Sequence, residues 1–463
     1  MAPQRLSALD ASFLDVETAS AHMHVGWAAA FDPPDDGPAP SFEQLRDHIS
    51  RRLHRAPRYR QRLAGVPLGL SRPVWVDDEA FDLGHHVRRA ATGDLHELAG
   101  TVLSTPLSRD RPLWEMWIAD ALEDGRIGLV GKAHHCMVDG LAAVELAALV
   151  LDPDPEPPPE PPDRWEPQPA PGVATRMVEG VVDRTLAQLS LVGTAARLAT
   201  SPASLATGAQ RAARALVSSL APANPIGALN EPISPYRTLA TLGRTLDELR
   251  AIKRAHGCTL NDVVLAAACG GVRRYLERRD DEPVRLKAMV PVNVRSEGAE
   301  SELGNRISFI FLELPCDEPD PERRLEDIGR ATSEAKQSGE PSGATTVLDL
   351  AAAAPSTLQR AVSRLIASPR TFNVVVSNIP GPQEPLWMLG CRLREAYPVV
   401  PLADRHALSI GFTSIAGGAF FGVYADRDAV SDAERLAADI GKELDGLARG
   451  APVRPREEAA PVA

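Results

Sequence analysis

Cysteine is scarce in this sequence, which has five in 463 residues and no C-x-x-C pair. An odd, dispersed set of cysteines in a long chain excludes a small disulfide-bonded scaffold and fits a reducing cytoplasm. The five are Cys136, Cys258, Cys269, Cys316 and Cys391.

Long apolar runs are also missing. No uninterrupted apolar stretch approaches the roughly 18 residues that a membrane span needs, and the N-terminus, MAPQRLSALDASFLD, lacks the apolar centre of a signal peptide. The net charge of -12 argues against a nucleic-acid partner, because phosphate neutralisation needs a basic face. We therefore expect a cytoplasmic protein whose contact with the inner membrane face or with lipid bodies, if it has one, is peripheral.

The length of the chain and its proline-rich middle predict two domains. With 463 residues, 44% apolar and 24% charged, the chain is globular in composition but too long for one ordinary core. Residues 151–172, LDPDPEPPPEPPDRWEPQPAPG, are typical of a solvated linker, because serial prolines cannot join helix or sheet ladders. We expect a first lobe at 1–152, a proline-rich linker and helical connection at 153–222, a second lobe at 223–450 and a disordered tail at 451–463.

Two helices are expected between residues 173 and 220, where Ala and Leu recur at helical spacing. Five arginines stand against two acids there, so one interpretation is a helix pair attracted to an anionic membrane surface. The other, which we favour, is a helix pair packed on the core with its arginines in water, because amphipathic helices are common in soluble domains.

Both lobes are expected to mix helices and strands. The pairs Ser41/Gln44 and Thr259/Asp262 have the spacing of N-terminal caps and predict helices that begin just after Ser41 and Thr259. Runs rich in Val, Ile and Phe and bounded by turn residues predict strands at 111–122, 126–135, 286–294, 307–315, 372–378, 406–414 and 419–426. The prediction is a mixed α/β protein of two lobes with its site at the lobe junction, a common place for pockets.

The stretch KAHHCMVDGLA, residues 132–142, concentrates side chains that can carry chemistry. The strand at 126–133 delivers the chain to His134, and a helix is expected to begin near Gly140, so the histidines and Asp139 lie on a strand-to-helix turn. A zinc site would need two ligands on one helical face or three separated imidazoles. Adjacent histidines tend to point apart, so we expect no metal here.

Three interpretations of the turn remain open. A structural histidine bonded to a backbone carbonyl describes His134 well. A neutral imidazole that faces a cleft would be a general base, since its ordinary pKa near 6.5 leaves it able to accept a proton at pH 7. Cys136 is a rival nucleophile, because a thiolate beside histidines can form an acyl-enzyme.

The motif H-H-x-x-x-D-G, present as His134, His135, Asp139 and Gly140, resembles the signature of the CoA-dependent acyltransferase superfamily. Further stretches occur in the order of one branch of it, so that nearly the whole chain resembles the bacterial wax ester synthase/diacylglycerol acyltransferase family. They are SALDASFLDVETASAHMHVG, RPLWEMWI, NEPISPYR, NDVVLAAACGGVRRYL, PVNVR, LGNRIS and VVVSNIPGP.

One stretch departs from that family's pattern. Ala416-Gly417 stands where the family usually has Asn-Gly before its Phe-Gly strand. A hairpin with a different turn accounts for the change, and the wall of the pocket can change with it.

The resemblance implies a two-lobed fold like that of chloramphenicol acetyltransferase, with the active site at the lobe interface. It implies transfer of a long-chain acyl group from acyl-CoA, a co-substrate, to a lipid hydroxyl without a cofactor. Diacylglycerol, which would give triacylglycerol, is the expected acceptor, and a long-chain alcohol, which would give a wax ester, is the nearest variant. By the family pattern His135 is the general base, His134 orients the turn, and Asp139 shapes the site.

Supporting roles are implied for four more residues. Arg295, in PVNVR, is the candidate cationic partner of Asp139. Gly140 is expected to let the backbone pass tightly beside the substrate. Asn261 and Asp262 match a family motif at a helix start and are expected to cap that helix and support the wall of the site.

Other polar clusters have simpler interpretations. His22 and His24 share one face of an expected strand, and His85 and His86 lack a following Asp-Gly, so we interpret all four as packing or surface residues. The arginines between 51 and 62 have the charge to meet CoA phosphates, but a solvated helix end is the favoured interpretation.

Two other functions stay open. One is a free-standing condensation-type acyltransferase that acts on a polyketide or peptide acceptor, although no carrier-protein domain is fused to the chain. The other is a catalytically idle protein of lipid surfaces, against which the complete histidine motif argues.

Overall fold

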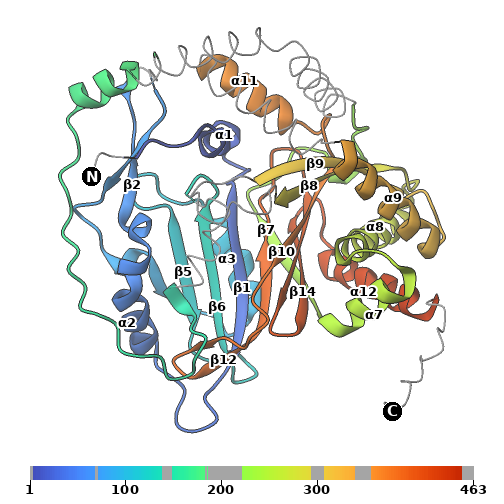
Figure 1. Cartoon of the computed structure of the whole chain (residues 1–463), viewed down its shortest axis with the longest axis horizontal. Helices are drawn as coiled ribbons and strands as arrows, with labels where there is room; N and C mark the ends of the chain where they lie inside the picture. The colour runs from blue at the N-terminus through green and yellow to red at the C-terminus, as the bar shows by residue number, and fades with distance from the viewer. Residues whose placement is uncertain are drawn as a thin grey trace, which may run out of the picture.

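Two six-stranded sheets lie side by side in the computed structural model of the chain, as Figure 1 shows. The structure describes residues 4–67, 71–137, 149–182, 185, 222–293, 307–338 and 356–450. This architecture confirms the predicted mixed α/β fold with two halves.

The first sheet has the strand order β11-β12-β1-β6-β5-β4. Its strands are β1 (His24–Asp32), β4 (Val87–Arg89), β5 (Trp114–Ala119), β6 (Ile127–His134), β11 (Trp387–Met388) and β12 (Cys391–Val399). β6 lies between β1 and β5 and is buried along its whole length, which explains its nearly continuous apolar sequence. On β1, Ala28 and Ala30 pack toward the second half of the molecule, whereas Ala29 and Phe31 pack into the core of the first.

The second sheet has the order β7-β14-β13-β10-β8-β9. Its strands are β7 (Arg237–Thr245), β8 (Leu286–Asn293), β9 (Ile307–Leu314), β10 (Val374–Pro380), β13 (Leu408–Ile415) and β14 (Gly418–Asp426). β10 runs parallel to β13 and β8, and the other neighbours are antiparallel. The sequence predicted all of these strands except β7.

Helices cover the outer faces of both sheets. The longer ones are α1 (Ala8–Val16), α2 (Phe42–Arg52), α3 (Leu95–Ser104), α7 (Leu246–His256), α8 (Leu260–Arg278), α9 (Pro321–Ser338), α11 (Ser356–Ile366) and α12 (Ala433–Gly450). Short elements are the strands β2 (Gln61–Ala64) and β3 (Val74–Asp77) and the 3-10 turns Leu53–Arg55, Pro57–Arg60, Leu83–His85 and Gly227–Leu229. α3 packs against both β6 and β7 and so joins the two sheets.

The two predicted helix caps are confirmed. Ser41 and Gln44 exchange hydrogen bonds at the start of α2, and Thr259 and Asp262 do the same at the start of α8.

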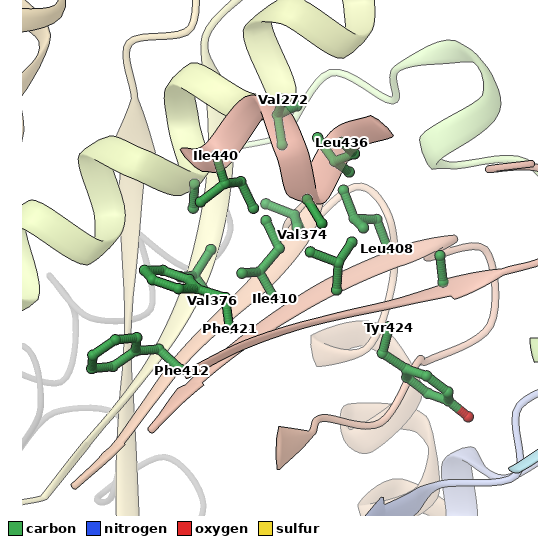
Figure 2. Packing of buried hydrophobic residues seen from close by; sticks show 14 of the residues in the cluster. Val272, Val374, Val376, Leu408, Ile410, Phe412, Phe421, Tyr424, Leu436 and Ile440 are labelled. Atoms are coloured by element: carbon green, nitrogen blue, oxygen red, sulfur yellow. The ribbon is translucent and has the colours of Figure 1, made fainter. Parts of the chain in front are cut away.

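The contact between α8 and α12 is close, because a Cβ on Gly271 would lie 2.5 Å from Ile440. Figure 2 shows Ile440, Leu436 and Val272 packed over the valines, leucines and isoleucines of the sheet.

Two strands, β11 and β12, belong to the sheet of the other half of the chain. β12 pairs with β1 in the first sheet, with Gly26 opposite Val399, although the chain on either side of β11 and β12 builds the second sheet. The lobe boundaries at 152 and 222 stay a prediction, and a division by chain position alone assigns β11 and β12 to the wrong sheet.

The proline-rich segment lies against the first half of the molecule along several contacts. Asp152 exchanges backbone hydrogen bonds with Trp387, and its carboxylate accepts one from Arg52 at 2.6 Å. Arg52 also donates to Glu160, while Arg60 pairs with Asp163. Arg52 and Arg60 are buried, so the interpretation of this arginine cluster as a solvated helix end was wrong for these two residues.

Candidate active site

Strand β6 and its partner β1 position the histidine turn. His134 is the last residue of β6 and lies opposite His24 on β1. The backbone N–H of His135 then donates to the carbonyl of Met23 at 2.9 Å, where Met23 holds a positive φ of 50°. A strained backbone next to a functional turn is a common arrangement, since the surrounding fold must hold it there.

The ring of His135 is stacked on Phe13 of α1, with ring centroids 3.7 Å apart and an interplanar angle of 13°. Its Nδ1 is buried and bonds to no other residue in the part of the chain that the structure describes. Burial lowers the pKa of His135 to about 4, so the imidazole is neutral at pH 7. Nε2 bonds to no described residue and the side chain is only half-buried, which leaves this nitrogen for a substrate.

His134 is held in a different way. Its Nδ1 accepts a hydrogen bond from the backbone N–H of Cys136 at 3.1 Å, so Nε2 carries the proton of the neutral ring. Nε2 lies 3.7 Å from a carboxylate oxygen of Glu17, which pairs with Arg109. Burial, with Arg109 and His135 nearby, keeps the pKa of His134 well below its ordinary value. This ring orients the turn.

The thiol of Cys136 is buried, and burial raises its pKa well above the ordinary range. A thiol in such surroundings stays protonated near neutral pH and is a poor nucleophile. The surroundings of Cys136 therefore favour His135 over sulfur as the reactive group.

The expected supporting residues divide between the two halves of the molecule. Asp139, Gly140 and Arg295 lie outside the described residues. Asp262 is buried, caps α8 and accepts a hydrogen bond from Thr332 of α9 at 2.7 Å, while Asn261 accepts one from Asn378 of β10 at 3.4 Å. Both fix the start of α8, and neither bonds to the histidine turn within the described ranges.

The other histidine pairs are packed, as predicted, with one exposed member. His86 lies between Phe81 and Trp114 in a stack, whereas His85 is exposed. His22 and His24 are buried with ring centroids 5.2 Å apart.

Sequence reasoning missed three residues around the turn. Phe13 and Glu17 contact the two histidines from α1, and Lys132 lies on the same strand two residues before His134. Lys132 is fully buried, and its Nζ donates to two backbone carbonyls of the α3 region, at 2.7 and 2.6 Å. Burial lowers its pKa to about 8. The helical pattern after Ser7 predicts α1, but only the tertiary fold brings Phe13 to His135.

No group of three His, Cys, Asp or Glu side chains arranged to hold a metal ion occurs among the described residues. A pocket of about 600 Å³ opens where the two sheets meet, lined among others by Asp32, Arg126, Arg244 and Arg394. It lies at the Asp32 end of β1, whereas the histidine turn lies at the His24 end, about 26 Å away along the strand. It is therefore separate from the histidine site.

Most of the sequence matches one family of known proteins. Residues 6–264 match the wax ester synthase/diacylglycerol acyltransferase catalytic domain, and residues 303–448 match the C-terminal domain of the same family. A probable diacylglycerol O-acyltransferase, tgs1, of Mycobacterium tuberculosis is 33% identical, with 94% of each chain covered.

Solved structures agree with this assignment. A wax ester synthase/diacylglycerol acyltransferase from Marinobacter aquaeolei VT8 is 27% identical over 97% of this chain and 99% of its own, with a TM-score of 0.70. The first condensation domain of the calcium-dependent antibiotic synthetase, 17% identical over 97% of both chains with a TM-score of 0.57, shares the fold. The chain belongs to the wax ester synthase/diacylglycerol acyltransferase family and is an acyl-CoA-dependent acyltransferase of that type.

Proposed function

We propose that the protein is a diacylglycerol O-acyltransferase that makes triacylglycerol from long-chain acyl-CoA, with His135 as the general base. The observation that carries the proposal is the neutral, half-buried imidazole of His135, whose Nε2 has no partner among the described residues. The naming of relatives at about 33% identity as probable diacylglycerol O-acyltransferases favours diacylglycerol as the acceptor.

The reaction needs one proton carrier. Nε2 of His135 takes the proton from the acceptor hydroxyl as its oxygen attacks the thioester carbonyl, so that a C–O bond forms. Collapse of the tetrahedral intermediate breaks the C–S bond, and the imidazolium returns the proton to the departing CoA thiolate. General-base catalysis of this kind contributes about 10²–10⁴-fold, and alignment of the two substrates supplies further rate.

The test measures free-thiol release from a long-chain acyl-CoA with diacylglycerol or with hexadecanol. We expect turnover of the wild type to be faster with diacylglycerol, and His135→Ala to lower kcat by about 10²–10⁴-fold. Cys136→Ala is the matched control on the same turn and should leave turnover close to that of the wild type.

Each other outcome contradicts part of the proposal. An unchanged rate in His135→Ala removes the base, and loss of turnover in Cys136→Ala moves the chemistry to sulfur. Faster turnover with hexadecanol makes the protein a wax ester synthase. No release with either lipid acceptor favours the condensation-type alternative.

We also propose that the enzyme works in the cytoplasm and touches the inner membrane face or a lipid body, where its acceptor is found. No helix within the described part of the chain has the length and apolar content to cross a bilayer. Half-exposed apolar side chains lie instead on the helix at 173–182 and on α11, which packs against α1 (Figure 1). They are Val173, Val178, Val181, Val182, Leu358 and Leu365, and we call this set the aliphatic surface.

A further inference from the structure

Helix α1 holds both histidines of the turn from one side. It begins at the cap Ser7, whose side chain accepts a hydrogen bond from the backbone N–H of Asp10. Phe13 covers one face of the His135 ring, and Glu17 at the C-terminal cap lies beside His134. Residues of α1 and of its C-terminal cap thus contact both rings of the pair.

The His135 ring differs from most buried histidines in how its plane is fixed. His48, His86 and His406 each have a ring nitrogen bonded to a backbone carbonyl, at 2.9, 2.8 and 3.0 Å. His135 has no such bond within the described ranges, where its Nδ1 also finds no partner in another residue. The contact that fixes the plane of its ring is the parallel stack on Phe13.

The position of Phe13 depends in turn on the second half of the chain. Nε of Arg360 on α11 donates to the carboxylate of Asp15, and Nε of Arg364 donates to the Asp15 carbonyl, both at 3.3 Å. These bonds join α11 to α1 two residues after Phe13. The stack is therefore held by contacts from both halves of the molecule.

We propose that Phe13 is a positioning residue for the acyl transfer, and that its stacked ring fixes the imidazole plane of His135 and keeps water from one face of it. The inference rests on the proposed function, because it needs His135 to be the base. A ring that is free to rotate would present Nε2 to the acceptor hydroxyl for only part of the time. Loss of the stack should therefore lower kcat more than it raises KM.

A change in pH separates this role from general stability. Among the described residues, the titratable and charged groups around the turn include His134, Cys136, Arg109, Arg58, Lys132 and His24 and, from α1 and its cap, Asp10 and Glu17; none of them is changed in a Phe13 variant. Removing the ring lets water reach His135, so its pKa should rise from about 4 toward the ordinary value. Because the neutral form is the base, activity should then be lost as the pH falls through the higher pKa.

The experiment compares Phe13→Leu, Phe13→Ala and Phe13→Tyr with the wild type and with His135→Ala, measuring kcat and KM from pH 5 to pH 8. Phe13→Leu should lower kcat by about 10–100-fold with a smaller change in KM, while Phe13→Tyr keeps the ring and should stay near the wild type. Phe13→Ala should also lose activity between pH 7 and pH 5.5, where the wild type is constant. Phe81→Ala is the matched control, because it removes a stack on His86 outside the site and should leave the pH profile unchanged.

The outcomes are distinguishable. If His135→Ala keeps its turnover, the proposed function fails. If His135→Ala is inactive while Phe13→Leu and Phe13→Ala keep the kcat and pH profile of the wild type, only the role of Phe13 fails. An equal loss of kcat in Phe13→Leu and Phe13→Tyr also overturns the role of Phe13. If Phe13→Ala does not fold, the comparison of these two variants still tests that role.

Discussion

His134 and His135 are neighbours in sequence, yet they do different work because β6 ends at His134 and His135 begins the turn that follows. His134 faces the side of the sheet that carries His24 and Lys132, and a backbone N–H fixes its ring. His135 meets Phe13 and keeps Nε2 without a partner in the described structure. The sequence motif predicts which residue types are present, but the division of labour depends on these tertiary contacts.

A single turn residue carries the departure from the family pattern. Ala416 and Gly417 both have positive φ, at 49° and 80°, in the hairpin between β13 and β14. Positive φ at both central residues is the turn geometry that Asn-Gly favours, so Ala416 adopts it under strain.

We expect Ala416→Asn to raise the free energy of unfolding by about 0.5–1 kcal/mol, because asparagine tolerates the left-handed region better than alanine. Ala416→Val should lower it, since a β-branched residue is least tolerated at positive φ. Urea unfolding midpoints at unchanged slope measure both changes. Equal midpoints for all three proteins would show that the turn is not strained.

At the scale of elements, the sequence predicts helix starts and apolar strands well. Both caps are local, and the strands of the second sheet carry strong Val, Ile and Phe signals. β12 was missed because its first half alternates buried residues with exposed Arg392 and Arg394, a weak signal in a single sequence. β7 was missed for a similar reason, since its end is polar and partly exposed.

At Gly271, where α8 packs against α12, glycine should be more stabilising than alanine, which is the opposite of the usual helix preference. Alanine is favoured over glycine in a helix by about 1 kcal/mol, but a Cβ at Gly271 would lie 2.5 Å from the side chain and 3.2 Å from the backbone N of Ile440. We expect Gly271→Ala to lower the free energy of unfolding by about 1–3 kcal/mol through overpacking.

Gly446, on the partner helix α12, is the control because no atom lies within 4 Å of a Cβ placed there. Gly446→Ala should raise the free energy of unfolding by about 0.5–1 kcal/mol. Thermal unfolding of the two variants should therefore shift in opposite directions, and shifts of the same sign would contradict the packing argument.

At the scale of the whole molecule, buried polar contacts join the halves. Arg237 at the start of β7 pairs with Asp426 of β14 and also donates to the carbonyl of Ser20 in the first half. No local pattern in the sequence predicts this contact, because its partners lie more than 180 positions apart along the chain. The sequence predicted that the two halves meet, but not which residues form the contacts between them.

The aliphatic surface makes a prediction about the whole protein. Val178 is 64% exposed, and Val181 and Val182 are about half exposed, so burying them in lipid should contribute roughly 1 kcal/mol each. Changing all three to Ser should weaken binding to phosphatidylcholine vesicles that contain diacylglycerol by tenfold or more. Turnover with a short, water-soluble alcohol should not change.

Vesicle co-sedimentation measures the binding, and the triple change to Leu is the control because it keeps the apolar surface. The Leu variant should bind at least as well as the wild type. Equal binding of the Ser variant and the wild type would place the lipid contact elsewhere on the protein.

The exchange of β12 into the first sheet also limits how substrates travel. Because β12 is hydrogen-bonded to β1 while its chain neighbours belong to the other sheet, the chain crosses between the halves on both sides of β11 and β12, and these crossings limit how far the halves can swing apart. Opening about a hinge, common in two-lobed enzymes, is thereby disfavoured. Long hydrocarbon chains would have to slide in and out lengthwise, so the release of a bulky product should slow with its chain length even when the chemical step does not.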